Sequence, residues 1–280
     1  MRYLVAVSGG IDSVVLLHQL VASGDHDLIV AHFDHGIRDD SADDARFVKG
    51  VAASYGLPFV MKREVLGAQA SEERARHQRY AFLRTMAQQY QAIIVTAHHA
   101  DDIIETIAIN IQRGTGWRGA AVMQTPGILR PLLSMTKAQI RAYALEKRLE
   151  WVEDSTNGSD KYLRNRLRRL FAARLTFERR GAIMDIWKRQ LSLKDAVEDE
   201  VKSFAHQNEY SRYYLNQIDS QSAIELLRAV IVVKTKLSPT RPQLTRAVIA
   251  IKTARPGAIF EVGAGVRLKF YIRTFIVETP

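Results

Sequence analysis

Cysteine is absent from this chain of 280 residues. Without thiols the protein forms no disulfide, has no thiolate metal site and uses no cysteine nucleophile. Long apolar runs are also absent: no stretch approaches the length that spans a bilayer, and the first residues lack the basic-then-apolar pattern of a signal peptide. We therefore expect a protein of the reducing cytoplasm that makes no contact with membranes.

Positive charge is in excess. Forty lysines and arginines outnumber thirty aspartates and glutamates, which gives a formal net charge of +10. An excess of this size favours a polyanionic partner, either nucleic acid or an acidic membrane surface, although a merely basic soluble protein is the alternative. The excess is local, as a binding face requires. It gathers at Lys161, Arg164, Arg166, Arg168, Arg169, Arg174, Arg179 and Arg180.

The order of apolar patterns predicts an α/β fold. Short apolar runs that read as strands lie at residues 3–7, 28–33, 58–61 and 92–96, with a further short one at 128–133. Helical periodicity separates them at residues 13–23, 41–55, 71–90 and about 101–112. This alternation favours a parallel, Rossmann-like sheet with helices on both faces.

The length of the chain favours two domains. We predict a catalytic domain at residues 1–180 and a smaller, mainly helical domain at 181–280. Its last part, from residue 239, contains glycines between short β-like runs.

The hexamer SGGIDS follows the first predicted strand and opens the first predicted helix. Glycines let the backbone N–H groups approach a ligand, and a helix start favours an anion. The loop lacks the lysine of a Walker A motif and the third glycine of a dinucleotide motif, and a strand–glycine–helix join that binds nothing is the alternative. The Asp12 carboxylate would repel bound phosphates unless a cation such as Mg²⁺ lay between them. The proposed nucleotide-binding residues are Ser8, Gly9, Gly10, Ile11, Asp12 and Ser13.

Acidic and histidine side chains follow two other predicted strands. AHFDHGIR occupies residues 31–38 and TAHHADD residues 96–102, with Glu105 three positions after Asp102. That spacing places two carboxylates on one face of the first helical turn, where they would hold a metal or an ammonium group. Helix capping is the plainer interpretation of either acid alone. A metal-hydrolase site is a further alternative, formed by His32, His35, His98, His99, Asp101 and Asp102.

Two basic segments complete the pattern. RGTG at residues 113–116 puts Arg113 on a glycine-rich loop that would close on a phosphate, although an ordinary surface turn fits the glycines equally well. DSTN at 154–157 leads into YLRNRLRR at 162–169, whose guanidiniums suit a phosphate backbone unless they form only a solvated face.

Taken in order, these motifs resemble a known family. SGGIDS resembles the pyrophosphatase loop of N-type ATP pyrophosphatases. AHFDHGIR, SEERARHQRYAFL, TAHHADDIIET, RGTG and DSTN–YLRNRLR resemble the tRNA(Ile)-lysidine synthetases. The resemblance covers roughly residues 3–175, and the C-terminal remainder looks shorter than in the family's longer members.

The resemblance implies a two-step ligase reaction in tRNA processing. ATP adenylates C2 of the wobble cytidine in an isoleucine tRNA with a CAU anticodon, and free lysine then displaces AMP. It also implies roles for individual residues. Asp12 would bind Mg²⁺ at the ATP phosphates, Arg113 would stabilise the reacting phosphate, and His98 would assist proton movement. The lysine would bind Asp102 and Glu105. The tRNA would bind Arg164, Arg166, Arg168 and Arg169, and also the C-terminal domain at residues 181–280, which the resemblance makes a tRNA-binding domain.

Other members of the superfamily are the main alternatives. The tRNA thiolases use cysteines, which this chain lacks. The amidating enzymes act on small acids, and for such substrates the enzyme would not need an arginine-rich helix. A non-catalytic nucleotide- or RNA-binding protein on the same fold is the alternative of a different class. The sequence does not distinguish a monomer from a homodimer.

Overall fold

The computed structural model describes residues 1–36, 41–65, 67, 71–153, 167, 170–171 and 175–278. The chain divides into two compact units, Met1–Lys188 and Arg189–Pro280. The division falls within helix α7 (Phe177–Glu200), a little after the boundary that we predict from the sequence. Each unit is described by itself.

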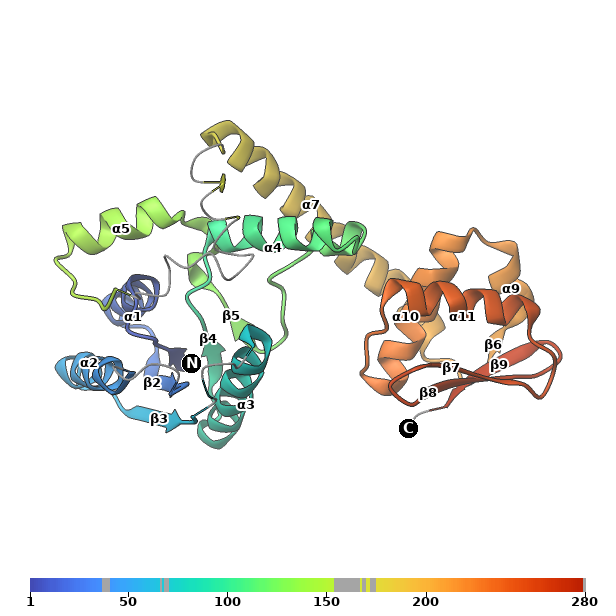
Figure 1. The fold of residues 1–280 in the computed structure, drawn as a ribbon, viewed down its shortest axis with the longest axis horizontal. Coiled ribbons are helices and arrows are strands. Elements are labelled where there is room, and N and C mark those ends of the chain that lie inside the picture. The colour runs from blue at the N-terminus through green and yellow to red at the C-terminus, as the bar shows by residue number, and fades with distance from the viewer. Residues whose placement is uncertain are drawn as a thin grey trace. The chain divides into compact units, whose positions relative to one another are not determined.

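The N-terminal unit contains a five-stranded parallel sheet with the strand order β3-β2-β1-β4-β5 (Figure 1). Helices connect successive strands, as the alternating apolar pattern predicts. The elements are β1 (Arg2–Ala6), α1 (Ile11–Ser23), β2 (Asp27–Asp34), α2 (Ser41–Ser54), β3 (Phe59–Arg63), α3 (Glu72–Tyr90), β4 (Ile93–Val95), α4 (Ala100–Gln112), β5 (Ile128–Leu129) and α5 (Lys137–Glu146).

Both faces of this sheet are covered, which confirms the predicted fold class. Tyr3 and Val5 of β1 belong to a core shared with α1, α2 and α5. Leu4, between them, packs on the opposite face with Tyr80 and Leu83 of α3. Successive side chains of a strand point to opposite faces, so a strand covered on both sides reads as a continuous apolar run.

The fifth strand is shorter than expected. Of the predicted residues 128–133, only Ile128–Leu129 pair with β4, and Pro131–Ser134 form a 3₁₀ turn. Proline has no N–H to donate to a sheet, and it is well placed at the start of a helical turn.

The strand order places the predicted motifs next to one another. The chain leaves β1 toward β2 on one side, and β4 pairs with β1 on the other. The carboxyl ends of β1 and β4 therefore flank the point where the strand order reverses, which is the usual ligand site of such sheets. The SGGIDS loop follows β1, and the TAHHADD segment follows β4.

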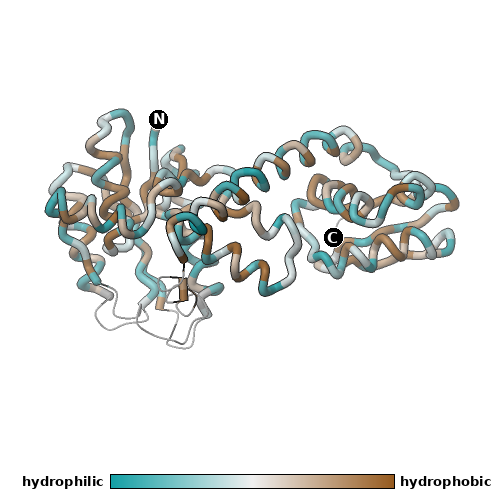
Figure 2. Tube along the Cα trace, turned by 90° about the horizontal axis from the view of Figure 1, so that it is seen from above, coloured by the Kyte–Doolittle hydropathy of each residue, from teal (hydrophilic) through white to brown (hydrophobic). Residues whose placement is uncertain are grey.

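The C-terminal unit is a second layered structure. An antiparallel sheet of order β6-β9-β8-β7 is formed by β6 (Tyr210–Ser211), β7 (Ile259–Gly263), β8 (Val266–Phe270) and β9 (Thr274–Glu278). One sheet face shares a core with α10 (Ser220–Thr235) and α11 (Arg241–Thr253). The short helices α8 (Lys202–Ala205) and α9 (Arg212–Gln217) complete the described part. Hydrophobic and hydrophilic residues alternate along its helices (Figure 2).

Helix α11 lies at the start of residues 239–280, a segment in which the sequence analysis named only glycines between short β-like runs. The signals for a helix were present. Thr240 and Gln243 form a capping box, and Pro242 occupies the first turn. This pattern is a recognised helix start, and it outweighs the β-branched residues that follow. Among the described residues, none of the helices is long and apolar enough to cross a membrane.

Candidate active site

The loop between β1 and α1 has a backbone shaped by its glycines and serines. Gly9 has a φ of +95°, a conformation that glycine adopts without strain. The Ser8 N–H donates to Ser13 Oγ at 3.1 Å, and the Ser13 hydroxyl donates to the Gly10 carbonyl at 2.8 Å. The loop is therefore held by its own side chains, with the first turn of α1 directly behind it. That arrangement suits a phosphate group.

The start of α4 gathers acidic side chains around one histidine. His99 is 3% exposed and is the N-cap residue of α4. Its backbone N–H donates to Asp102 Oδ2 at 3.0 Å. The ring nitrogen Nε2 lies 3.6 Å from Asp102 Oδ2 and 3.9 Å from Asp12 Oδ1. Nδ1 lies 3.8 Å from Asp101 Oδ2. His99 thus stands among three aspartates and brings the loop after β1 together with the helix after β4.

Glu105 lies one turn after Asp102 on the same helix face, as the sequence predicts. Its side chain is buried, with 2% of the residue exposed, whereas the Asp102 side chain is 15% exposed. A buried carboxylate is costly unless it has partners, and Glu105 interacts with other groups of the protein.

A lysine from a later helix completes the group. The Lys137 ammonium donates to both carboxylate oxygens of Asp12, at 2.6 and 2.7 Å. The Lys137 backbone N–H donates to Asp101 Oδ2 at 2.7 Å, which ties the start of α5 to the start of α4. Arg180 of α7 forms an ion pair with Asp101. The sequence interpretation did not assign Lys137 or Arg180 to the site, because nothing local marks a residue so far along the chain.

His98 and His35 are neutral at ordinary pH. Burial lowers the pKa of His98 to about 3, and the positive charges of Arg130, Arg76 and Arg79 act in the same direction. Asp102 opposes them by raising this pKa. Burial also lowers the pKa of His35 to about 4. Nδ1 of His98 lies 2.9 Å from Thr96 Oγ1, a contact that orients the ring.

Two arginines of α3 approach this region. Arg76 and Arg79 both stack on Tyr80, with guanidinium carbons 5.1 and 5.6 Å from the ring centre. Their effect on the pKa of His98 indicates that α3 supplies positive charge to the same edge of the sheet. These residues belong to the SEERARHQRYAFL motif, which carried no assigned role.

Other predicted residues lie elsewhere. Arg113 ends α4, eleven residues after Asp102, which at the rise of an α-helix is about 16 Å along its axis. The structure does not bring it to the aspartate group. Arg164, Arg166, Arg168 and Arg169, and the DSTN segment, lie outside the described residues. Within the described ranges, no group of three or more His, Asp or Glu side chains has the geometry to hold a metal ion.

The family model of the PP-loop domain matches residues 1–175. The chain belongs to the PP-loop family. We refer to the SGGIDS segment after β1, which resembles the pyrophosphatase loop, as the PP-loop. The matched region also contains the aspartate group around His99 together with Lys137.

Curated relatives share this region. A protein of Solibacter usitatus named tRNA(Ile)-lysidine synthase is 35% identical over 234 residues, which cover 80% of this chain and 49% of that protein. A protein of the same name from Geobacter sulfurreducens is 40% identical over 181 residues, covering 60% of this chain and 38% of the relative. The chain thus spans about half the length, or less, of the curated relatives that it matches.

A solved structure supports the fold. The U34-tRNA thiolase NcsA from Methanococcus maripaludis, determined with its [4Fe-4S] cluster, superposes with a TM-score of 0.59 over 69% of this chain and 72% of its own. Its sequence identity is 16%, so the likeness extends to the fold alone. Cluster ligation by cysteine has no counterpart here, because the chain contains no cysteine.

Proposed function

We propose that this protein is a tRNA(Ile)-lysidine synthetase, a ligase that joins lysine to the wobble cytidine of an isoleucine tRNA with a CAU anticodon. One observation carries the proposal: the PP-loop aspartate Asp12 and the acidic face of α4 meet around the buried His99. A single site then holds an anionic ligand beside a cationic one. Matching relatives of that name add support.

In the first step the C2 oxygen of cytidine attacks the α-phosphate of ATP, and pyrophosphate leaves. Residues 8–13 would hold the phosphates through backbone N–H groups and the serine hydroxyls. Mg²⁺ usually keeps one or two protein carboxylates and completes its shell with phosphate and water, so Asp12 alone suffices as the protein ligand. Lys137 would exchange Asp12 for a phosphate oxygen when the metal–nucleotide binds.

In the second step the ε-amine of lysine attacks C2, and AMP leaves. Asp102 and Glu105 would bind the ammonium groups of the incoming lysine, since two carboxylates on one helix face match a cationic substrate. The attacking amine must be unprotonated, so a nearby group has to accept its proton.

His98 is the proposed acceptor. With a pKa of about 3 it is a poor base in the ligand-free protein. Bound phosphates would bring negative charge that raises this pKa, in opposition to Arg76, Arg79 and Arg130. Proton transfer would therefore depend on ATP or the adenylated intermediate being in place.

The tRNA would contact the basic stretch from Arg164 to Arg169, and Arg113 would reach a phosphate only if its glycine loop changed position. A tRNA substrate places the proposed reaction in the cytoplasm. The number of subunits stays open, with a homodimer as one alternative.

The test is direct. The protein is incubated with ATP, Mg²⁺, labelled lysine and an unmodified CAU-anticodon isoleucine tRNA, and label in the tRNA is measured together with released pyrophosphate. A tRNA with the wobble cytidine replaced by uridine serves as the control. Label in the first tRNA alone is expected. Folded protein that binds ATP but labels neither tRNA would contradict the proposal and favour a non-catalytic binding protein.

A further inference from the structure

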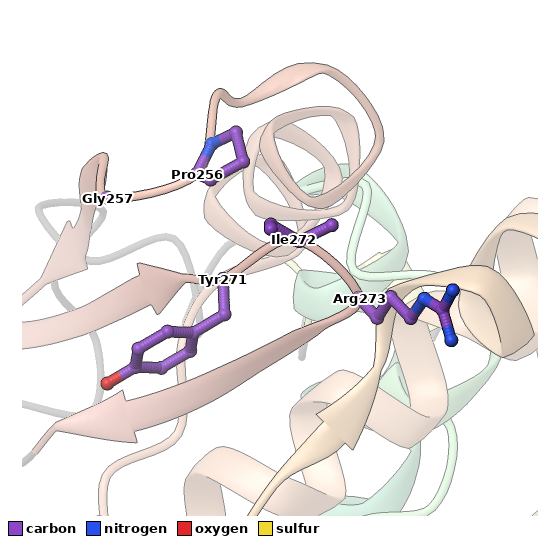
Figure 3. A pocket seen from close by; sticks show the side chains of 5 residues that line it. All are labelled: Pro256, Gly257, Tyr271, Ile272 and Arg273. Atoms are coloured by element: carbon purple, nitrogen blue, oxygen red, sulfur yellow. The ribbon is translucent and has the colours of Figure 1, made fainter.

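The C-terminal unit contains a pocket that the proposed chemistry does not use. It lies where the loop after α11 meets the turn between β8 and β9, and its volume is about 540 Å³. Its lining is Pro256, Gly257, Tyr271, Ile272 and Arg273 (Figure 3). A volume of this size accommodates a nucleotide-sized group.

The side chains of the β8–β9 turn are presented to solvent. Ile272 is 80% exposed and Tyr271 40%. Figure 3 shows the tyrosine ring and the Arg273 guanidinium pointing away from one another on either side of the turn. The Arg212 backbone N–H donates to the Arg273 carbonyl at 2.9 Å, so the backbone at Arg212 lies next to the turn. The next residue, Tyr213, is exposed and provides a second aromatic side chain from this part of the chain.

A buried guanidinium holds the pocket in shape. Arg212 is 9% exposed and donates to the carbonyls of Ile251, Ala254 and Tyr271 at 2.9, 2.6 and 2.9 Å. It thereby joins the end of α11 to the turn. The rings and charges around the pocket are consequently presented by an ordered backbone rather than by a loose hairpin tip.

The charge around the turn is positive. On the outer face of the sheet Arg267 lies opposite two acids, Glu261 and Glu278, in register. Lys269, two residues nearer the turn, lies instead opposite Ile259 and Ile276. Among the described residues, no carboxylate comes within ion-pair distance of Lys269, Arg255 or Arg273. The two acids thus lie across from Arg267, away from the turn. Lys269 Nζ lies 5.9 Å from the centre of the Tyr271 ring, so this positive charge is close to the aromatic ring and can contact an external anion.

We propose that this pocket binds an unpaired nucleotide of the tRNA other than the wobble cytidine. Tyr271 stacks on its base, and Arg273, with Lys269 and Arg255, contacts the flanking phosphates. Aromatic rings among basic side chains suit single-stranded nucleic acid, because every base has a face to stack and every nucleotide has a phosphate. An acidic protein surface would be drawn to the same charges but would not require an aromatic ring. The inference rests on the proposed function for the identity of the RNA.

Binding of the full chain to the isoleucine tRNA is measured by fluorescence anisotropy at several salt concentrations. Tyr271→Leu keeps an apolar side chain but loses the stacking ring, and about tenfold weaker binding is expected with an unchanged salt slope. Tyr271→Phe should bind like the wild type. Arg273→Gln should weaken binding and lower the slope of log K against log salt by about one, as loss of a phosphate contact does. Arg246→Gln, an exposed arginine on α11, is the matched control and should change the affinity less.

Wild-type affinity for Tyr271→Leu and Arg273→Gln, with each variant folded by circular dichroism, would overturn the inference. Equal losses for Tyr271→Leu and Tyr271→Phe would exclude stacking and overturn it as well. Lysidine formation by the wild type is measured separately. A protein that forms no lysidine but loses tRNA affinity in these variants would refute the proposed function and leave the pocket assignment intact.

Discussion

The Lys137 ammonium lies 2.6 and 2.7 Å from the two carboxylate oxygens of Asp12. One residue begins α5 and the other belongs to the first turn of α1, so the contact joins segments 125 residues apart. In the proposed function a metal–nucleotide would bind next to Asp12, where the Lys137 ammonium lies in this structure. Lys137 would then have to move from the carboxylate to a phosphate, so that a cation would stay beside the PP-loop.

Loss of the Lys137 side chain should impair use of ATP. Lys137→Ala removes a cation that would contact phosphate, and a charged hydrogen bond of this kind is worth about 1.5–3 kcal/mol. We expect the KM for ATP to rise roughly tenfold or more, with a smaller effect on the KM for lysine. Pyrophosphate release in the presence of tRNA is the measurement. Lys147→Ala, which removes a lysine just after α5 that forms an ion pair with its neighbour Glu146, is the control. Equal effects of the two variants would contradict the assignment.

The acid at the start of α4 should matter for lysine rather than for ATP. Asp102→Asn keeps an oxygen that accepts the His99 N–H, so the helix cap survives while the charge is removed. The KM for lysine should rise about tenfold or more, and the KM for ATP should change little. Asp43→Asn, at the exposed first turn of α2, is the control. Comparable losses for both substrates would argue against lysine binding by Asp102.

Two glycine replacements should act in opposite directions. Gly9→Ala forces alanine to a φ of +95°, which costs about 1–2 kcal/mol of backbone strain and distorts the PP-loop. Gly50→Ala, within α2, meets no atom within 4 Å and should stabilise the protein by about 0.5–1 kcal/mol.

Urea unfolding followed by tryptophan fluorescence tests both glycine changes. All three tryptophans, Trp117, Trp151 and Trp187, belong to the N-terminal unit, so the signal reports on that unit. A Gly9→Ala protein as stable as the wild type would show that the loop backbone differs from the one described.

The stability of the N-terminal unit should fall in mild acid partly because of His98. Its pKa is about 3 in the folded protein and near 6.5 when unfolded, so between these values only the unfolded chain binds the proton. The free energy of unfolding therefore rises with pH in this window, by up to about 1.4 kcal/mol per pH unit for this group. The contribution of His98 to the free energy of unfolding is complete above about pH 6.5 and is lost progressively toward pH 3.

The variant His98→Gln should reduce that pH dependence. Urea midpoints at pH 7.0 and 5.0 are compared by tryptophan fluorescence, and the difference between the two should be smaller in the variant than in the wild type. His77→Gln on the exposed side of α3 should leave the difference as it is. A variant His98→Gln whose midpoints fall in parallel with the wild type would show that His98 is not buried in its neutral form.

Features that depend on neighbouring residues were predictable from the sequence. The PP-loop between a strand and a helix, the two carboxylates three residues apart on α4 and the alternation of strands with helices are local patterns. Each rests on backbone conformation, helical spacing or apolar periodicity over a few residues. The start of α11, which the sequence analysis did not single out, is also marked locally, because Thr240, Pro242 and Gln243 form a helix-start signal.

Which of these segments share a site depends on long-range packing and could not be predicted from local patterns. Pairing of β4 with β1, rather than sequence proximity, brings the acids of α4 to Asp12, and the contacts of Lys137 and Arg180 follow from how α5 and α7 pack. Such contacts depend on strand order and on long-range burial, which no window of neighbouring residues encodes.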